Sequence, residues 1–276
     1  MKNSHIITFY ILQILKKGFS SINARKRFYI ASRIGAMFFH YLGIRKKQAR
    51  ANIERAFPNL EADKIEKILK NTYLNFCHNF IEFTSFPLSY KNMDIKVKGL
   101  KKLQSFLKQK KGIVLITGHF GSWEVLGQWV AENVPLFVGV AQKQKNEGAH
   151  NFFINQREIA GIKHIFRGKS VNLMYDVLSK NGILGLVSDQ DAKKKGVFID
   201  FFGVPASTPK GAALFHINTE APLLLGMCFK ENFQKYHIHF KTINTKNKSI
   251  KHITQEYTGY LESYIKKYPD QYFWFH

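Results

Sequence analysis

Apolar residues follow two different periods along the chain, and these periods alternate. Short apolar runs bounded by glycine, proline or polar residues predict buried strands at 113–116, 137–141, 183–187 and 223–228. Apolar residues at helical spacing predict helices at 61–80, 100–110, 173–178 and 253–268, and another from 122 onward. Alternating apolar and polar residues predict a strand at 95–97 and an edge strand at 236–240. This alternation of strands and helices indicates an α/β fold with a mostly parallel sheet flanked by helices.

The first sixty residues are basic as well as apolar. Residues 1–50 contain eleven Lys or Arg and no acid. The segments 6–15 and 29–42 each have an apolar face, yet no run reaches the ~18 apolar residues of a membrane-spanning helix. Such segments are typical of helices that lie in a membrane interface, and the alternative is an ordinary helical cap on the core. We therefore divide the chain into basic membrane-interface helices at 1–60 and an α/β domain at 61–276.

The segment 112–133, GIVLITGHFGSWEVLGQWVAEN, joins a predicted strand to a predicted helix through a glycine-rich turn. His119 stands in the turn and Glu124 in the first turn of the helix, at the junction where α/β folds place their chemistry. A carboxylate folded back by the turn would hold the imidazole in the tautomer that accepts a proton. We therefore predict that His119, oriented by Glu124, is the general base for a hydroxyl that attacks an activated acyl group. The alternative is a histidine that hydrogen-bonds a nearby acid for structural reasons alone.

Three further stretches carry more polar residues than a core needs. Arg167, in the segment FRGKS, precedes a predicted helix and is suited to bind a phosphate or a carboxylate. Asp189 and Gln190 follow the strand GILGLV, at the sheet edge where sites are built. The segment 201–211, FFGVPASTPKG, predicts a Gly/Pro turn that leads into a helix. The plainer interpretations are a surface charge, a turn cap and a packed loop, respectively.

Composition narrows the class of partner. The 276 residues include 42 Lys and Arg against 19 Asp and Glu, a formal net charge of +23. This charge attracts nucleic acid, an anionic membrane, a phosphorylated lipid or an acidic carrier protein, unless it is only a lysine-rich background. No helix-turn-helix, zinc-finger or RNA-binding signature is present, so we expect no nucleic acid. Two distant cysteines, and the lack of a P-loop or a dinucleotide fingerprint, indicate neither a metal nor a nucleotide cofactor.

As a set, these segments resemble one family, the late acyltransferases of lipid A biosynthesis, which add secondary acyl chains. The resemblance covers essentially the whole chain and keeps the order of the motifs. They are a basic N-terminal helix, N-x4-FP at Asn52–Pro58, GHFGSWE, an Arg before a helix, a D-Q pair, FFG-x-PA-x-T-x-x-G, and a PxxYxWxH-like end at 269–276.

The resemblance implies a glycerol-phosphate-acyltransferase-like fold, bound at the cytoplasmic face of the bacterial inner membrane. It implies an acyl thioester donor, usually on acyl carrier protein, and a phosphorylated, already acylated lipid A precursor as acceptor. His119 matches the family's base and Glu124 its orienting acid. Arg167, Asp189 and Gln190 match polar positions near the site, and we expect them to bind substrate.

Two features depart from the family pattern. The family usually has a longer anchor before its first basic helix, whereas only about 25 residues precede Lys26 here, so we expect peripheral anchoring. The family also continues past the final Trp-x-His with a basic tail, whereas this sequence stops at His276.

A thioester is already activated, so the reaction needs only a base and donors for the oxyanion. We expect those donors to be backbone N–H groups at the start of the helix after His119, or Arg167. No Ser or Cys stands in a G-x-S-x-G elbow, so direct transfer is expected, with Ser122 a weaker candidate nucleophile. The alternatives are a related acyltransferase for a glycerophospholipid or a mannosylated inositol lipid, a non-catalytic membrane-surface protein, and a nucleic-acid-binding protein.

Overall fold

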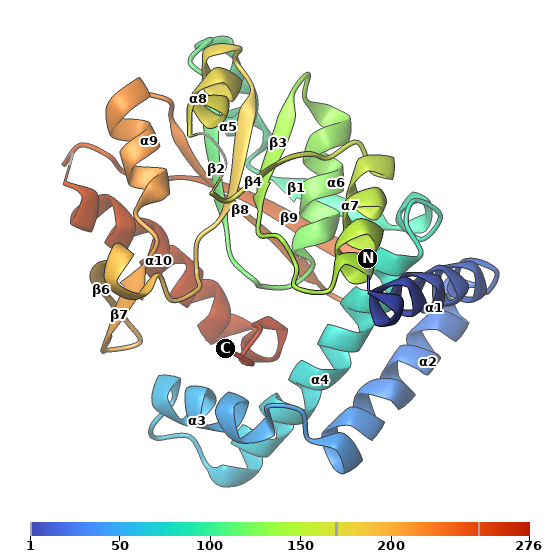
Figure 1. Ribbon diagram of the computed structural model, residues 1–276. Helices are drawn as coiled ribbons and strands as arrows, with labels where there is room; N and C mark the ends of the chain where they lie inside the picture. The colour runs from blue at the N-terminus through green and yellow to red at the C-terminus, as the bar shows by residue number, and fades with distance from the viewer. Residues whose placement is uncertain (1, 169–170, 248) are drawn as a thin grey trace.

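The computed structural model describes residues 2–168, 171–247 and 249–276, and within them the strands form one large sheet and one small one. The strands are β1 (Asp94–Lys98), β2 (Ile113–Thr117), β3 (Phe137–Ala141), β4 (Lys163–Phe166), β5 (Ile183–Val187), β6 (Val197–Phe201), β7 (Val204–Thr208), β8 (Leu223–Lys230) and β9 (Lys235–Thr242). Seven of them form a sheet in the order β1-β9-β8-β2-β5-β3-β4, and β6 and β7 form a separate hairpin (Figure 1). The strands from β8 to β4 are parallel, whereas β9 is antiparallel to β8 and pairs in parallel with β1.

Helices cover both faces of the sheet and extend beyond one end of it (Figure 1). They are α1 (Asn3–Ser20), α2 (Ala24–Met37) with a π-helical turn (Phe38–Leu42), α3 (Lys46–Ala56), α4 (Ala62–Thr84), α5 (Leu100–Lys108), α6 (Trp123–Asn133), α7 (Glu147–Ile159), α8 (Asn172–Ser179), α9 (Gly211–Thr219) and α10 (Ile250–Lys267). Short 3₁₀ turns lie at Tyr90–Asn92, Lys193–Lys195 and Pro269–Gln271.

The central strands are apolar on both sides because both of their faces are buried. Successive side chains of a strand point to opposite faces. Val114 and Ile116 of β2 therefore belong to the core that α8, α9 and α10 cover, whereas Ile113 and Leu115 belong to the core that α5 and α6 cover. A parallel strand of this kind is a continuous apolar run rather than an alternating one.

The predicted α/β fold with a mostly parallel sheet is confirmed, and two local predictions are wrong. Residues 236–240 do not form an edge strand, because β9 lies between β8 and β1, and β1 is the edge. The segment 201–211 is not only a turn, because β6 and β7 pair around Phe202 and Gly203 before α9 begins. The helix α7 and the strand β4 carry apolar residues too sparsely for the sequence pattern to predict them.

The N-terminal helices pack on the rest of the protein. α1 lies along α7 and α2 lies along α4 (Figure 1). Ala31 of α2 is buried against Cys77 and Ile81 of α4, and Ala49 and Ile53 of α3 lie in the same core as the sheet. These helices therefore cap the core, and the domain boundary at residue 60 stays a prediction.

The outer faces of α1 and α2 leave large apolar side chains in solvent. These residues are Ile6, Ile7, Tyr10, Ile11, Ile14 and Leu15 of α1, and Tyr29, Ile30 and Met37 of α2. No helix in the described part of the chain combines the length and the hydropathy needed to cross a bilayer.

Candidate active site

The loop after β2 holds His119 at the carboxyl edge of the sheet. β2 and β5 are neighbouring parallel strands with Thr117 opposite Val187, so the loops that follow them meet side by side. Gly121 lets the first of these loops approach β8 closely. Its φ is +56°, and a Cβ there would collide with the carbonyl oxygen of Cys228. The local fold therefore places His119 beside the end of β5.

Asp189, two residues beyond β5, is the acid that holds the imidazole. Its Oδ1 lies 2.8 Å from His119 Nδ1, and its Oδ2 accepts the backbone N–H of His119 over 2.7 Å. The Asp189 side chain is completely buried, whereas that of His119 is 22% exposed. Burial alone would raise the pKa of Asp189, but the charge and the hydrogen bonds of His119 outweigh it and lower that pKa. The ionised carboxylate therefore accepts the Nδ1 proton and leaves Nε2 as the proton acceptor.

Glu124 does not hold His119, and the predicted contact between them is wrong. Arg157 of α7 binds both carboxylate oxygens of Glu124, with Nη2 2.6 Å from Oε1 and Nε 3.1 Å from Oε2. Burial acts to lower the pKa of Arg157, but the charge and the hydrogen bonds of Glu124 raise it overall. The physical reason is strand pairing, which brings Asp189 to the imidazole from 70 residues away.

Gln190 and His276 stand next to the proton-accepting nitrogen of His119. The amide nitrogen of Gln190 lies 3.5 Å from His119 Nε2 and 3.3 Å from His276 Nε2. The two imidazole rings are 5.3 Å apart and nearly perpendicular. Asp189 and Gln190, which the sequence predicted as site residues, thus both contact the side chain of His119. His276, which was not predicted as a site residue, lies beside them.

The C-terminal segment, residues 269–276, lies across the site and was not predicted to belong to it. The backbone N–H of Phe273 donates to the carbonyl of His119 over 3.0 Å. The rings of Trp123 and Phe273 lie 5.3 and 6.1 Å from the imidazole. These aromatic rings shield the imidazole from water on several sides. The aromatic run YFWFH at the end of the sequence was the available signal for this role.

A cavity of about 670 Å³ opens beside Asp189 and His276. Its lining combines apolar side chains of the β6–β7 hairpin and the C-terminal segment with cations from α3 and the loop after β5: Phe198, Phe201, Phe202, Val204, Trp274, Arg55, Lys193 and Lys194. The predicted functional loop, FFGVPASTPKG, contributes much of this wall. The carboxylates of Asp189 and Asp191 line it as well, so the cations outnumber the acids by three to two. A largely apolar cavity with cations in its lining suits an acyl chain attached to a phosphorylated group.

Arg167 lies apart from this group. It follows β4, and β5 and β3 lie between β4 and β2, a separation of about 14 Å across three strand spacings. Its side chain is exposed, and its backbone N–H donates to the carbonyl of Ala141 over 2.8 Å. Lys169 and Ser170 of the same segment lie outside the described residues. The predicted contact of Arg167 with substrate stays a prediction.

The first turn of α6 offers backbone N–H groups close to His119. The hydroxyl of Ser122 donates to Asn79 Oδ1 over 2.6 Å instead of capping the helix, and the backbone N–H of Ser122 donates to the carbonyl of Cys228. The N–H groups of Trp123, Glu124 and Val125 thus receive no side-chain cap from Ser122 at the positive end of the helix dipole, and the N–H of Leu126 is the first to donate back to the Ser122 carbonyl.

Three residues of the site are also spaced as metal ligands. Ligand atoms of His119, Asp189 and His276 lie within 4.8 Å of one another, a spacing that a divalent ion can use.

Known proteins match this chain along most of its length. The family model for bacterial lipid A biosynthesis acyltransferases matches residues 4–276. The phosphatidylinositol mannoside acyltransferase of Mycobacterium tuberculosis H37Rv is 31% identical over 154 residues, 53% of this chain and 49% of that protein. The chain therefore spans about half the length of that relative.

Two further relatives align over more of the chain. The phosphatidylinositol mannoside acyltransferase of Mycolicibacterium smegmatis is 25% identical over 230 residues, 81% of this chain and 76% of that protein. The lipid A biosynthesis palmitoleoyltransferase of Escherichia coli K12 is 24% identical over 268 residues, 90% of this chain and 83% of that protein. Because the family model matches nearly every residue, the chain belongs to the bacterial lipid A biosynthesis acyltransferase family.

Proposed function

We propose that this protein is a membrane-associated O-acyltransferase that moves a fatty acyl chain from an acyl thioester to a hydroxyl of a lipid A precursor. The observation that carries the proposal is the pair formed by His119 and Asp189. A buried carboxylate fixes one imidazole nitrogen and leaves the other as a base, next to an apolar cavity with basic residues in its lining. Membership of the acyltransferase family supports the same chemistry.

His119 is the general base in this mechanism. The acceptor hydroxyl gives its proton to Nε2 while its oxygen attacks the carbonyl carbon of the thioester. Nδ1 keeps its proton and donates it in the hydrogen bond to Asp189, whose carboxylate stabilises the imidazolium that forms. The N–H groups at the start of α6 donate to the oxyanion of the tetrahedral intermediate. The carbon–sulfur bond then breaks, and Nε2 returns the proton to the departing thiolate.

Glu124 has a positioning role in this proposal rather than a direct contact with His119. Its ion pair with Arg157 ties the first turn of α6 to α7. That turn carries Trp123, whose ring packs against the imidazole. Loss of the pair would therefore loosen the base and the oxyanion donors together.

The cavity beside Asp189 separates the apolar and the charged parts of the substrates. The acyl chain lies against Phe198, Phe201 and Phe202 of the hairpin, and the phosphate of the acceptor lies near Arg55 and Lys194. The donor in this proposal is acyl carrier protein, an acidic partner for a chain of net charge +23. The apolar outer faces of α1 and α2 support contact with a membrane surface, which in this proposal is the cytoplasmic face of the inner membrane.

A second acceptor is favoured by one specific observation. Phosphatidylinositol mannoside acyltransferases are among the relatives, one of them at 31% identity. A glycosylated inositol lipid is therefore the alternative acceptor for the same base and the same cavity.

The test is acyl transfer by the purified protein in detergent, with acyl carrier protein thioester as donor and each acceptor offered separately. We expect wild-type protein to acylate the lipid A precursor and His119→Ala to lose about 10²- to 10⁴-fold in rate. Transfer to the inositol lipid alone would mean that the acceptor is the glycosylated inositol lipid and not the lipid A precursor. A His119→Ala variant with more than about a tenth of the wild-type kcat would remove His119 as the base.

A further inference from the structure

A second cavity, of about 680 Å³, lies at the turn between α1 and α2 and shares no residue with the cavity beside Asp189. Its walls come from three segments of the chain: Ser20, Ile22, Asn23, Ala24, Arg25, Arg27, Leu88, Lys91, Asn92, Phe233 and Gln234. They belong to the α1–α2 turn with the first turn of α2, to the loop after α4, and to the turn between β8 and β9. Nothing in the acyl-transfer mechanism uses this cavity.

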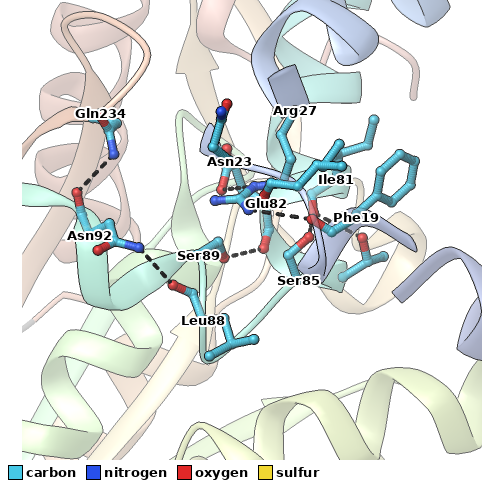
Figure 2. Close-up of polar contacts among 12 residues, drawn as sticks. Phe19, Asn23, Arg27, Ile81, Glu82, Ser85, Leu88, Ser89, Asn92 and Gln234 are labelled. Atoms are coloured by element: carbon cyan, nitrogen blue, oxygen red, sulfur yellow. Dashed lines mark hydrogen bonds and ion pairs between the residues drawn. The ribbon is translucent and has the colours of Figure 1, made fainter. Parts of the chain in front are cut away.

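The lining of this cavity is basic and amide-rich. Arg25, Arg27 and Lys91 supply cations, whereas no Asp or Glu lines it. Asn92 and Gln234 form one side, and Asn23 and Arg27 of α2 form another (Figure 2). The first turn of α2 adds the positive end of its helix dipole. This combination of donors recognises an anion with several oxygen acceptors.

Arg27 is built into the wall. Its side chain is only 4% exposed, and its Nη1 donates to the carbonyls of Ile22 and Phe19 over 2.6 and 3.3 Å (Figure 2). Within the described part of the chain its Nε makes no regular hydrogen bond, and it forms an ion pair with Glu82 Oε2 at 3.5 Å. Arg27 is thus held in the wall by two backbone carbonyls and a long ion pair, and it keeps its positive charge beside the cavity.

The charges around Glu82 are unbalanced in the same sense. Arg27 and Lys230 are both buried and both face the carboxylate of Glu82. Burial lowers the pKa of Lys230 to about 8, although the charge of Glu82 acts to raise it. Because two buried cations face one carboxylate, an excess positive charge remains in the protein interior. An anion in the adjacent cavity would stabilise that charge.

We propose that this cavity binds the phosphate headgroup of an anionic phospholipid at the membrane surface. The proposal rests on the membrane association proposed above. The phosphate lies among Arg25, Arg27 and Lys91. Its acyl chains follow the apolar side chains that leave this region, including Leu88 at the cavity and Tyr29 on α2. A free phosphate would make no use of these apolar neighbours.

Two double variants of equal charge test the proposal. Arg25→Gln/Lys91→Gln removes two exposed cations that line the cavity, and Lys26→Gln/Arg33→Gln removes two exposed cations that do not. Co-sedimentation measures their binding to phosphatidylcholine vesicles with and without phosphatidylglycerol, at physiological salt. General attraction to anionic lipid falls equally in both variants, since it depends on charge. We expect the cavity variant to bind the phosphatidylglycerol vesicles about tenfold more weakly than the control variant, with no difference on pure phosphatidylcholine.

Three outcomes would overturn the headgroup site. Equal losses in the two variants would mean that net charge alone attracts the protein. A cavity variant that loses stabilisation by inorganic phosphate in a thermal titration, but binds vesicles like the control, would mean a free-phosphate site. Failure of the wild-type protein to bind the phosphatidylglycerol vesicles would remove the lipid altogether. Acyl transfer in detergent, measured on the same proteins, reports separately on the proposed enzymatic function.

Discussion

At His119 the two ring nitrogens have different partners, and this difference sets what the side chain can do. Nδ1 faces a buried carboxylate that remains ionised because its pKa is lowered. Among the described residues, the partner of Nε2 is the amide of Gln190 at 3.5 Å, a weak contact that an incoming hydroxyl can displace. A neutral imidazole held in this way is a base whose orientation and tautomer are fixed in advance.

Asp189→Asn should therefore impair catalysis while keeping the shape of the site. An asparagine can turn its amide nitrogen toward Nδ1, which places the proton on Nε2 and removes the base. We expect kcat to fall about 10²- to 10⁴-fold, while the melting temperature changes little. Glu124→Gln is the matched control because it also neutralises one carboxylate on a residue near His119. A larger loss of kcat in Glu124→Gln than in Asp189→Asn would mean that Glu124, and not Asp189, orients the imidazole of His119.

The sequence singled out His119 as a candidate base but did not predict the contact with Asp189, for a physical reason. His119 stands in a glycine turn after an apolar strand, and both features are local. Its partner depends on which strand lies beside β2, and that neighbour, β5, is about 70 residues away. Asp189 and Gln190 were predicted as site residues from their place after a strand, but no local pattern could pair them with His119. The positions of Phe273 and His276 beside His119 also became visible only in the tertiary structure.

At the scale of elements, the β6–β7 hairpin forms the wall against which the acyl chain is proposed to lie. Phe198 lines this cavity, yet 61% of its side chain is exposed, so the fold does not depend on it. We expect Phe198→Ser to raise the KM for a long-chain acyl donor more than it lowers kcat, because it removes ground-state apolar contact. Ile159→Ser, at an exposed apolar residue of α7, is the control. Steady-state kinetics with unchanged KM in Phe198→Ser would place the chain elsewhere.

The contact between α2 and α4 makes the stability depend on pH. His78 of α4 is buried, stacks on Phe28, and lies 2.9 Å from the hydroxyl of Ser32. Burial, with the charge of Lys230, lowers its pKa to about 3. Between about pH 6.5 and pH 3, His78 is therefore protonated in the unfolded chain and neutral in the folded protein. The free energy of unfolding consequently falls as the pH falls.

His78→Gln should flatten this dependence. From about pH 7 to pH 5 the wild-type protein loses about 2 kcal/mol of stability through His78 alone, and the variant lacks that loss. Glutamine keeps a polar group near Ser32, although its stability at neutral pH is lower because the stacking on Phe28 is lost. Urea unfolding at the two pH values measures the slope. The same slope in both proteins would mean that His78 does not control the acid response.

At the scale of the whole molecule, α1 and α2, at one end of the sheet, together carry nine of the exposed large apolar residues (Figure 1). A deletion of these helices would expose the buried contacts of Ala31 and Cys77, so substitutions are the sharper test. Ile7→Ser/Ile11→Ser/Ile14→Ser changes only exposed residues and should reduce binding to anionic vesicles at least about tenfold. The control is Val171→Ser/Leu173→Ser, which changes two exposed apolar residues at the start of α8. Undiminished binding of the folded triple variant would move the membrane contact away from α1.

Much of the architecture was predictable, because it depends on local periodicity. The buried strands 113–116, 137–141, 183–187 and 223–228 all recur in the parallel sheet, since a strand buried on both faces is an apolar run wherever it stands. The order of the strands in the sheet was not predictable from such runs. The β6–β7 hairpin was missed although β6 is mostly apolar, because the glycines and the prolines of 201–211 predicted a turn.

In the proposed function, this protein adds an acyl chain to a lipid, and His119 is the base. Mass spectrometry of the lipid A from cells that lack the protein, and from the same cells with wild-type protein or His119→Ala at equal abundance, tests it most directly. We predict a lipid A species heavier by one acyl chain with the wild-type protein only. Identical lipid A in all three, or the same heavier species with His119→Ala, would contradict the account.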